Sequence, residues 1–574
     1  MRYEGGVKNV SERVAGHELR VRDLASVRDA LEARANRISL FRLISFLTAV
    51  GVLISAFRQS SSAWLALGVG LTAVFFAAVA WHARVIERKH GVEVRIAIHQ
   101  RHLKRIAGNW QDLPSTGAGI LPPSHPYASD IDLIGPGSLF QRIDVSQTRE
   151  GERALATALA EPVPWEQAKA RQPAVGELSE KDTLREELEA LGAVKQQRGQ
   201  KLDHQPFMAL LKLPPVFAPR PWLRPLSIGM VSVTLILLVL SQLDVVPGAL
   251  MWLMLIAQGV LLWSLSKPVH ESLDVLTARI GFAQSYQAML RAIERESFRA
   301  PHLLALQARL KVQDKTASQL MERLARYEGL AQLRTQGPLY IVLNVLTLWD
   351  LFCLERIESF LRDVGPHSED WFRVVAELEL LCSFATLQHI DVGASMPVLQ
   401  DGAVTLRADG LVHPLLSSTS RVANDLTLSG PGTALIVTGS NMAGKSTLLR
   451  AVGLNVALAL AGGPVCAREL VTSRFRLRAS MRIDDSLQRG ASYFHAELTR
   501  LRMVVGELDV GAPVLFLLDE LLRGTNAHAR HQGARAVLLH LLARGALGLV
   551  ATHDVALSEL EEELPGQVRN VHFT

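Results

Sequence analysis

The stretch ALIVTGSNMAGKSTLLRAVG, residues 434–453, is the most informative segment of the sequence. It begins with four apolar residues, a pattern typical of a short strand buried in a parallel sheet. Residues 447–460 then have the pattern of a helix. The segment between them fits G-x-x-x-x-G-K-[ST], in which a glycine-rich loop joins a strand to a helix. We therefore expect a strand, a phosphate-binding loop and a helix in this order.

The backbone of such a loop determines its chemistry. Its N–H groups turn inward at the start of the helix and surround phosphate oxygens. Lys445 is the only lysine after Lys315, and an ammonium fits so narrow a space better than a planar guanidinium does. Ser446 would hold Mg²⁺ through its hydroxyl. The alternative is a strand, turn and helix that carry these residue types by chance. The candidate nucleotide-binding residues of the loop are Gly439, Ser440, Asn441, Met442, Ala443, Gly444, Lys445 and Ser446.

Length and composition set broad limits. The 574 residues are too many for one hydrophobic core, so about two to four domains are expected. The net charge of +5 suits a partner such as nucleic acid or anionic lipid without distinguishing between them. Cys353, Cys382 and Cys466 are isolated in the sequence. The sequence therefore predicts neither a disulfide framework nor a cysteine metal site.

Four segments lack charged residues: 43–57, 59–81, 225–243 and 245–266. The last three are long enough to cross a membrane, and the first reaches that length if Arg42 extends to the interface. Arginine and lysine residues flank the outer ends of both pairs, so both termini and the middle of the chain are expected in the cytoplasm. We predict two transmembrane hairpins in a multi-pass protein of the inner (cytoplasmic) membrane. Buried core helices of a soluble protein are the alternative.

The sequence pattern changes along the chain and predicts five regions. The short alternating runs AVTLRA and DLTLSG indicate strands, and the rest of the C-terminal part alternates strand and helix. This alternation predicts an α/β domain with a largely parallel sheet. The regions are a cytoplasmic N-terminal helix at 1–36, transmembrane hairpin 1 at 37–84, a basic helix and linker at 85–130, a helical region at 131–400 interrupted by transmembrane hairpin 2 at 225–266, and the α/β domain at 401–574.

Two further motifs follow the loop. VLFLLDE, residues 514–520, is an apolar run that ends in paired carboxylates. Asp519 would hold Mg²⁺ through water or Ser446, and Glu520 would polarise the attacking water. LVATHD then ends a third strand at His553, which could hydrogen-bond a γ-phosphate and sense its presence. Taken alone, the acidic pair could be a helix cap and the histidine an ordinary loop residue.

This order of motifs is that of ABC-type ATPases, in which a second subunit completes each site. The L-S-G-G-Q run that transporters use for this purpose does not occur in the sequence. The corresponding place holds DDSLQRGASYFHAELTRL, residues 484–501. Ser492 precedes a predicted helix there, and its hydroxyl could face a γ-phosphate across a dimer. An ordinary helix cap by Ser492 explains the same pattern.

These motifs together resemble the DNA mismatch-repair MutS family. TGSNMAGKSTLLR, GASYFHAEL, LLDELLRGTNAHAR and ATHD are similar to the family's T-G-P-N-M-A-G-K-S-T, S-T-F-M-x-E-M, D-E-x-G-R-G-T-S and A-T-H. Upstream, GPGSLFQRIDVSQTREGERALATAL at 135–159 resembles the start of the family's helical core. The resemblance covers about residues 131–574, interrupted by the second predicted hairpin. It implies a helical core and lever at 131–400 and an ABC-type P-loop ATPase domain at 401–574.

The resemblance also implies roles for single residues. Asp519 would be the metal-binding carboxylate and Glu520 the catalytic one. Ser492 would reach the ATP of the partner subunit, and His553 would sense the γ-phosphate. The family further implies a homodimer, formed through the ATPase domains, whose ATP state is coupled to a clamp around DNA. The residues that would bind ATP phosphates and Mg²⁺ are Gly439, Asn441, Gly444, Lys445, Ser446 and Thr447.

The sequence departs from the family pattern at several positions. Mismatch readers carry a Phe-x-Glu motif, and none of the 18 phenylalanines here begins one. Ser440 replaces the loop proline, Tyr493 replaces a threonine, and Leu522 replaces a glycine. The sequence ends at NVHFT, where relatives usually continue into a segment that supports dimerisation, so a fragment of a longer protein is one interpretation.

We therefore predict a membrane-anchored, MutS-like, Mg²⁺-dependent ATPase that acts as a dimer and binds DNA in an ATP-dependent manner. The alternative is a membrane ABC-type ATPase that acts on a protein or lipid partner. A half-transporter is disfavoured because the apolar segments lack the ionisable residues that line translocation paths. The basic residues at 95–105 suit DNA phosphates, but a basic helix beside a membrane is more often directed at lipid headgroups.

Overall fold

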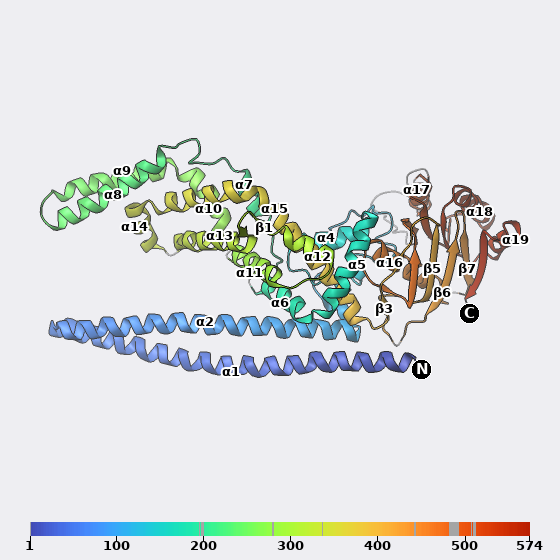
Figure 1. Cartoon of the computed structure of the whole chain (residues 1–574), viewed down its shortest axis with the longest axis horizontal. Coiled ribbons are helices and arrows are strands. Elements are labelled where there is room, and N and C mark those ends of the chain that lie inside the picture. The colour runs from blue at the N-terminus through green and yellow to red at the C-terminus, as the bar shows by residue number, and fades with distance from the viewer. Residues whose placement is uncertain are drawn as a thin grey trace. The chain divides into compact units, whose positions relative to one another are not determined.

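Figure 1 shows the computed structural model of the chain, which describes residues 2–573 except 195, 197–199, 278–280, 336, 419, 441–442, 482–492, 507 and 509–511. The chain divides into two compact units. Unit 1 comprises Met1–Ile143, Leu159–Ala168 and Ala385–Thr574. Unit 2 comprises Asp144–Ala158 and Lys169–Phe384. Unit 1 contains both the N-terminal helices and the predicted α/β region.

Unit 1 begins with two long helices, α1 (Arg2–Gln59) and α2 (Ser62–Ala107), which lie side by side (Figure 1). Neither sequence contains a proline, so nothing in it breaks the run of helical hydrogen bonds. Ser60, with a φ of 47°, lies in the short turn between them. α2 ends at Gly108, whose left-handed φ of 86° is a common helix stop. The segments predicted as the first hairpin and as the basic helix thus lie on the same two continuous helices.

The α/β region is built on a parallel sheet of five strands in the order β10-β11-β12-β7-β13. This sheet confirms the predicted α/β domain with a largely parallel sheet. In sequence order the strands are β7 (Ala434–Gly439), β10 (Arg476–Ser480), β11 (Val514–Asp519), β12 (Leu547–Ala551) and β13 (Val568–Phe573). The larger helices of the region are α16 (Lys445–Leu460), α17 (Tyr493–Gly506) and α18 (Ala527–Ala543), and the short α19 (Leu560–Glu563) precedes β13.

The central strands of this sheet are apolar on both faces because helices cover both. Phe516 and Leu518 of β11 share a core with the apolar side of α18. Leu517 points to the other face, because successive side chains of a strand alternate. There a Cβ on Gly453 of α16 would lie 2.8 Å from the Leu517 side chain, so the glycine lets α16 approach the sheet closely. The helix that follows the phosphate loop is therefore held firmly against the strands.

A second sheet of four strands is mixed. Three of its strands precede β7 in the sequence, and the fourth lies between β7 and β10. The order of this sheet is β4-β9-β5-β6, and β5 pairs antiparallel with both β6 and β9. The strands are β4 (Val398–Leu399), β5 (Thr405–Leu411), β6 (Asn424–Ser429) and β9 (Glu469–Thr472). β5 and β6 confirm the strands predicted from AVTLRA and DLTLSG. A further pair, β3 (Ala394–Ser395) and β8 (Val465–Cys466), is antiparallel.

Unit 2 is almost entirely helical. An aromatic group formed by Phe207, Phe282, Tyr286 and Phe372 fills part of its core, with ring centroids 4.8–6.1 Å apart. β1 (Lys311–Val312) and β2 (Lys315–Thr316) form a short hairpin. The helices are α4 (Arg149–Ala160), α5 (Trp165–Glu180), α6 (Asp182–Ala193), α7 (Gln205–Lys212), α8 (Leu223–Gln242), α9 (Gly248–Ser264), α10 (Ser266–Thr277), α11 (Phe282–Arg295), α12 (Pro301–Ala308), α13 (Ala317–Ala331), α14 (Pro338–Thr347) and α15 (Trp349–Ile390), the ends of α4, α5 and α15 lying in unit 1.

Three described helices are long and apolar enough to cross a membrane: Val10–Gln59, Ser62–Ala107 and Leu223–Gln242. A fourth span would require α9 and α10 to act together, although their axes bend by 64° at the break. These helices overlap the four uncharged segments of the sequence. Length and composition alone do not place a helix in a bilayer, so membrane insertion stays a prediction.

Candidate functional site

The loop between β7 and α16 has the predicted strand–loop–helix form. Gly444 caps α16 with a left-handed φ of 96°, a conformation that glycine adopts without strain. Lys445 opens the helix and is 5% exposed. Its Nζ donates to the carbonyl oxygens of Gly439 at 2.8 Å and Ser440 at 2.9 Å. The lysine therefore curls back over the loop, at the positive N-terminus of a helix.

The structure brings Ser446 and Asp519 together. The Ser446 hydroxyl donates to Asp519 Oδ2 at 2.5 Å. Burial raises the pKa of Asp519, and the neighbouring Glu520 raises it further, against the lowering effect of the Ser446 hydrogen bond. Asp519 Oδ1 is buried and has no hydrogen-bond partner among the described residues. A hydroxyl and a carboxylate with an unused buried oxygen are ligands that suit Mg²⁺.

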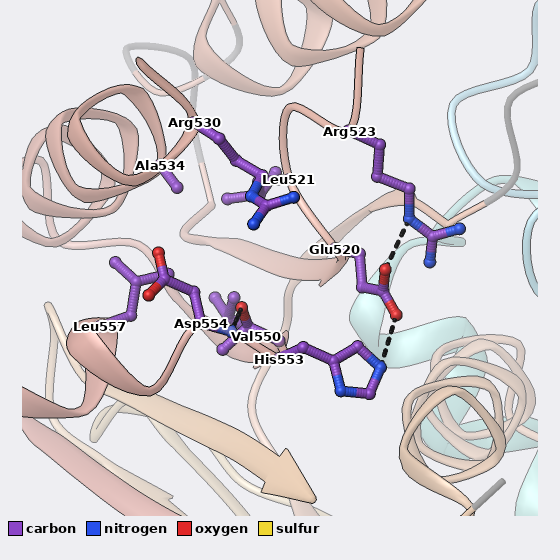
Figure 2. Close-up of a pocket in the computed structure, with 10 residues that line it drawn as sticks. Glu520, Leu521, Arg523, Arg530, Ala534, Val550, His553, Asp554 and Leu557 are labelled. Carbon is purple, nitrogen blue, oxygen red and sulfur yellow. Dashed lines mark hydrogen bonds and ion pairs between the residues drawn. The ribbon is translucent and has the colours of Figure 1, made fainter. Parts of the chain in front are cut away.

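Glu520 and His553 are also brought together. Glu520 Oε1 lies 3.0 Å from His553 Nε2, and Glu520 Oε2 lies 2.9 Å from Arg523 Nε. His553 Nε2 is in turn 3.3 Å from Lys445 Nζ. Figure 2 shows the Glu520 carboxylate between the side chains of His553 and Arg523. The predicted catalytic carboxylate, the predicted phosphate sensor and the loop lysine therefore form one continuous polar group.

A small cavity of about 140 Å³ lies beside this group. Glu520, Arg523 and His553 line it, together with Arg530 and Asp554 (Figure 2). Asp554 Oδ2 lies 3.0 Å from Nδ1 of His531 on α18. The cavity is large enough for water, and the charged groups on its wall make it polar, so water can lie next to Glu520.

The sheet explains why these residues meet although they lie up to 108 positions apart in the sequence. Lys445 follows β7, Asp519 ends β11, and His553 lies two residues beyond β12. β11, β12 and β7 are neighbours and run parallel. The carboxyl ends of parallel strands open on the same edge, which is the usual ligand site of an α/β sheet. The side chains that follow the strands therefore converge there.

The backbone after β11 is unusual and was not predicted. Glu520 and Leu522 have φ values of 48° and 58°, a left-handed region that residues with a Cβ rarely adopt. The carboxylate of Glu497 accepts hydrogen bonds from the N–H groups of Leu522 at 2.5 Å and Arg523 at 3.3 Å. Sequence reasoning missed both Glu497 and Arg523. They lie within the motifs GASYFHAEL and LLDELLRGTNAHAR, but only tertiary contact reveals their positions.

Three predicted site residues, Asn441, Met442 and Ser492, lie outside the described residues. Of the other predicted members, Gly439 ends β7 and Ser440 follows it, while residues 443–447 form the end of the loop and the start of α16. α17 begins at Tyr493, directly after Ser492 in sequence. The predicted role of Ser492 across a dimer therefore stays a prediction.

Comparison with known proteins agrees with this geometry. The family MutS domain V matches residues 435–574. Residues 435–574 are therefore similar to the MutS family. Similar proteins include the DNA mismatch repair protein MutS of Thermotoga petrophila, 31% identical over 221 residues, which are 38% of this chain and 27% of that protein. The MutS of Chlorobium phaeovibrioides is 36% identical over 201 residues, or 34% of this chain and 22% of that protein.

A third similar protein is named as an endonuclease. The endonuclease MutS2 of Solidesulfovibrio magneticus is 38% identical over 211 residues, which cover 35% of this chain and 27% of that protein. The chain therefore spans only about a quarter of the length of these curated MutS-family relatives. The residues that match MutS domain V, 435–574, include Lys445, Asp519 and His553.

Lys445→Ala and Lys445→Arg should each weaken ATP binding by roughly 10- to 100-fold, because a charged hydrogen-bonding group contributes about 1.5–3 kcal/mol. The arginine variant keeps the charge but places a planar group where the loop accommodates an ammonium. Binding of a fluorescent ATP analogue to the detergent-solubilised full chain measures the effect. Lys315→Ala, at an exposed lysine of β2, is the matched control. Unchanged affinity in both Lys445 variants would contradict the assignment.

Proposed function

We propose that the chain is a Mg²⁺-dependent ATPase of the MutS type. The observation that carries this proposal is the convergence of three pairs at one edge of the parallel sheet. Lys445 contacts the loop carbonyls, Ser446 contacts Asp519, and Glu520 contacts His553. Phosphate binding, metal binding and activation of water need these three kinds of group in this neighbourhood.

Each side chain would have a distinct role. The loop N–H groups and Lys445 would bind the β- and γ-phosphates, at a helix N-terminus that favours anions. Ser446 and Asp519 would hold Mg²⁺, which neutralises phosphate charge when bound. Glu520 would orient the attacking water and accept its proton. Each Glu520 oxygen makes one of these contacts, with His553 or Arg523, and keeps a second lone pair that can accept a hydrogen bond from water.

Glu520→Gln should lower the rate of ATP hydrolysis by about 100-fold or more while ATP still binds, because a positioned general base contributes about 10²- to 10⁴-fold. The amide keeps the size of the side chain but accepts protons poorly. Single-turnover hydrolysis and ATP binding are measured on the full chain. Glu561→Gln, at an exposed glutamate of α19, serves as the control. Normal turnover in the Glu520 variant would remove the assigned role.

We further propose that ATP binding and hydrolysis are coupled to DNA through the helical region, in a homodimer formed by the ATPase domains. Similarity to the MutS family supports this part of the proposal, since the relatives include proteins named for DNA mismatch repair. Ser492 would approach the nucleotide of the partner subunit. Mismatch recognition itself is not proposed, because the sequence contains no Phe-x-Glu motif.

DNA should stimulate ATP hydrolysis, and the stimulation should fade as salt rises, because contacts to phosphates release counterions. Hydrolysis is measured with homoduplex, mismatched and branched DNA at two salt concentrations. Heparin is the control for a general response to polyanions. Hydrolysis that is indifferent to every DNA would contradict DNA coupling and favour the alternative, a membrane ATPase that acts on a protein or lipid partner.

We also propose that the chain is a multi-pass protein of the inner membrane. Large apolar side chains are exposed on the candidate spans, including Phe57 at 92% and Trp263 at 79%, and lipid would cover them. A buried polar contact joins α8 and α9: Gln258 Nε2 donates to Thr234 Oγ1 at 2.8 Å. Polar pairs of this kind join helices within bilayers.

Membrane insertion predicts that the chain stays in the membrane pellet after alkaline carbonate extraction, because lipid-facing apolar helices resist release. Immunoblotting of pellet and supernatant fractions measures this. A peripheral protein of the same cells is the control. Release of the full chain into the supernatant would contradict insertion.

A further inference from the structure

Glu497 contacts the backbone at residues 522–523, close to the proposed catalytic glutamate. It lies near the start of α17 and is 2% exposed. Its Oε1 accepts hydrogen bonds from two consecutive backbone N–H groups, those of Leu522 and Arg523. Its Oε2 is buried without a hydrogen-bond partner among the described residues. A buried carboxylate is costly unless such donors compensate it, so this contact has a substantial role in the local structure.

The backbone that Glu497 binds is strained. Leu522 has a φ of 58°, in the left-handed region that glycine adopts without strain and leucine rarely adopts. A left-handed residue lets two successive N–H groups point at the same anion, which is the geometry of a backbone nest. The carboxylate of Glu497 occupies that nest. The hydrogen bonds therefore stabilise a conformation that a leucine would otherwise avoid.

The leucine side chain is fixed as well. Leu522 is 6% exposed and belongs to the core between the sheet and α18. A Cβ on Gly533 of α18 would overlap Leu522 Cδ1, so the glycine provides the space that the leucine fills. The strained segment is thus held from two sides, by Glu497 on its N–H groups and by the core on its side chain.

This segment places the proposed catalytic carboxylate. Glu520 lies two residues before Leu522 and itself has a left-handed φ of 48°. Arg523, whose N–H bonds Glu497, also contacts Glu520 Oε2 at 2.9 Å. Any change in the backbone at 522–523 therefore moves the group that orients Glu520. A displacement of about 1 Å at a catalytic group can lower a rate by roughly 100-fold.

We propose that Glu497 is a positioning residue that holds the left-handed backbone at Leu522 and thereby sets Glu520 and Arg523 for hydrolysis. The inference rests on the proposed ATPase function of this site. Glu497 has no proposed contact with nucleotide. It therefore affects the rate of hydrolysis and not the affinity for ATP.

The test compares Glu497→Ala with Glu497→Gln in the full chain. We expect the alanine variant to lose about 10- to 100-fold in kcat, with its Kd for ATP changed less than about threefold. The glutamine variant should keep most of the activity, because one amide oxygen accepts both N–H groups as Oε1 does now. Melting temperatures are measured for each variant, and assays are run well below them.

A second substitution separates positioning from general damage. Leu522→Gly removes the backbone strain, whereas Leu522→Ala removes the same core contacts and keeps a Cβ at the left-handed position. In the Glu497→Ala background, Leu522→Gly should recover at least about tenfold in kcat, and Leu522→Ala should not. Equal behaviour of the two double variants, or normal kcat in Glu497→Ala, would overturn the proposal.

Amide exchange provides a readout that does not depend on ATPase activity. Hydrogen–deuterium exchange of a peptide covering residues 520–523 should accelerate in Glu497→Ala and stay slow in Glu497→Gln. Unchanged exchange in Glu497→Ala would overturn the positioning role even if the chain hydrolyses ATP. Absence of hydrolysis in the unmodified chain would remove the proposed function, while the exchange result would still decide whether Glu497 holds the segment.

Discussion

Parallel pairing of β11, β12 and β7 is the constraint on which the site depends. It brings the ends of three strands to one edge of the sheet, so that Ser446 reaches Asp519 and His553 reaches Glu520. None of these residues is close to its partner in sequence. Without this register, the loop, the proposed metal-binding carboxylate and the proposed base would lie apart.

Two residues with strained backbone conformations lie at this edge of the sheet. Glu520 and Leu522 adopt left-handed conformations directly after the strand that ends in Asp519. Strained backbone of this kind persists only where surrounding contacts determine it, and it is found most often at functional sites. Here the contacts come from Glu497 and from the core beneath Leu522. The precision of the site therefore depends on α17 and α18 as much as on the strands.

Much of this arrangement could be predicted because its signals are local. The phosphate loop has a fixed spacing, and β5 and β6 show the alternation of half-buried strands. The positions of Asp519 and His553 follow once both are placed at the ends of parallel strands. The contact of Glu497 with residues 522–523 could not be predicted, because it joins segments 25 residues apart and depends on a backbone conformation that leucine rarely adopts. Pairings between very short strands, such as β3 with β8, also lack a local signal.

The proposed roles of these residues all require that this edge of the sheet hydrolyses ATP with Mg²⁺. The most direct measurement is steady-state ATP hydrolysis by the detergent-solubilised full chain, with Mg²⁺ and with a chelator in its place. The proposed function predicts turnover with Mg²⁺ that is lost with the chelator. Turnover that is equal under both conditions, or none under either, would contradict it.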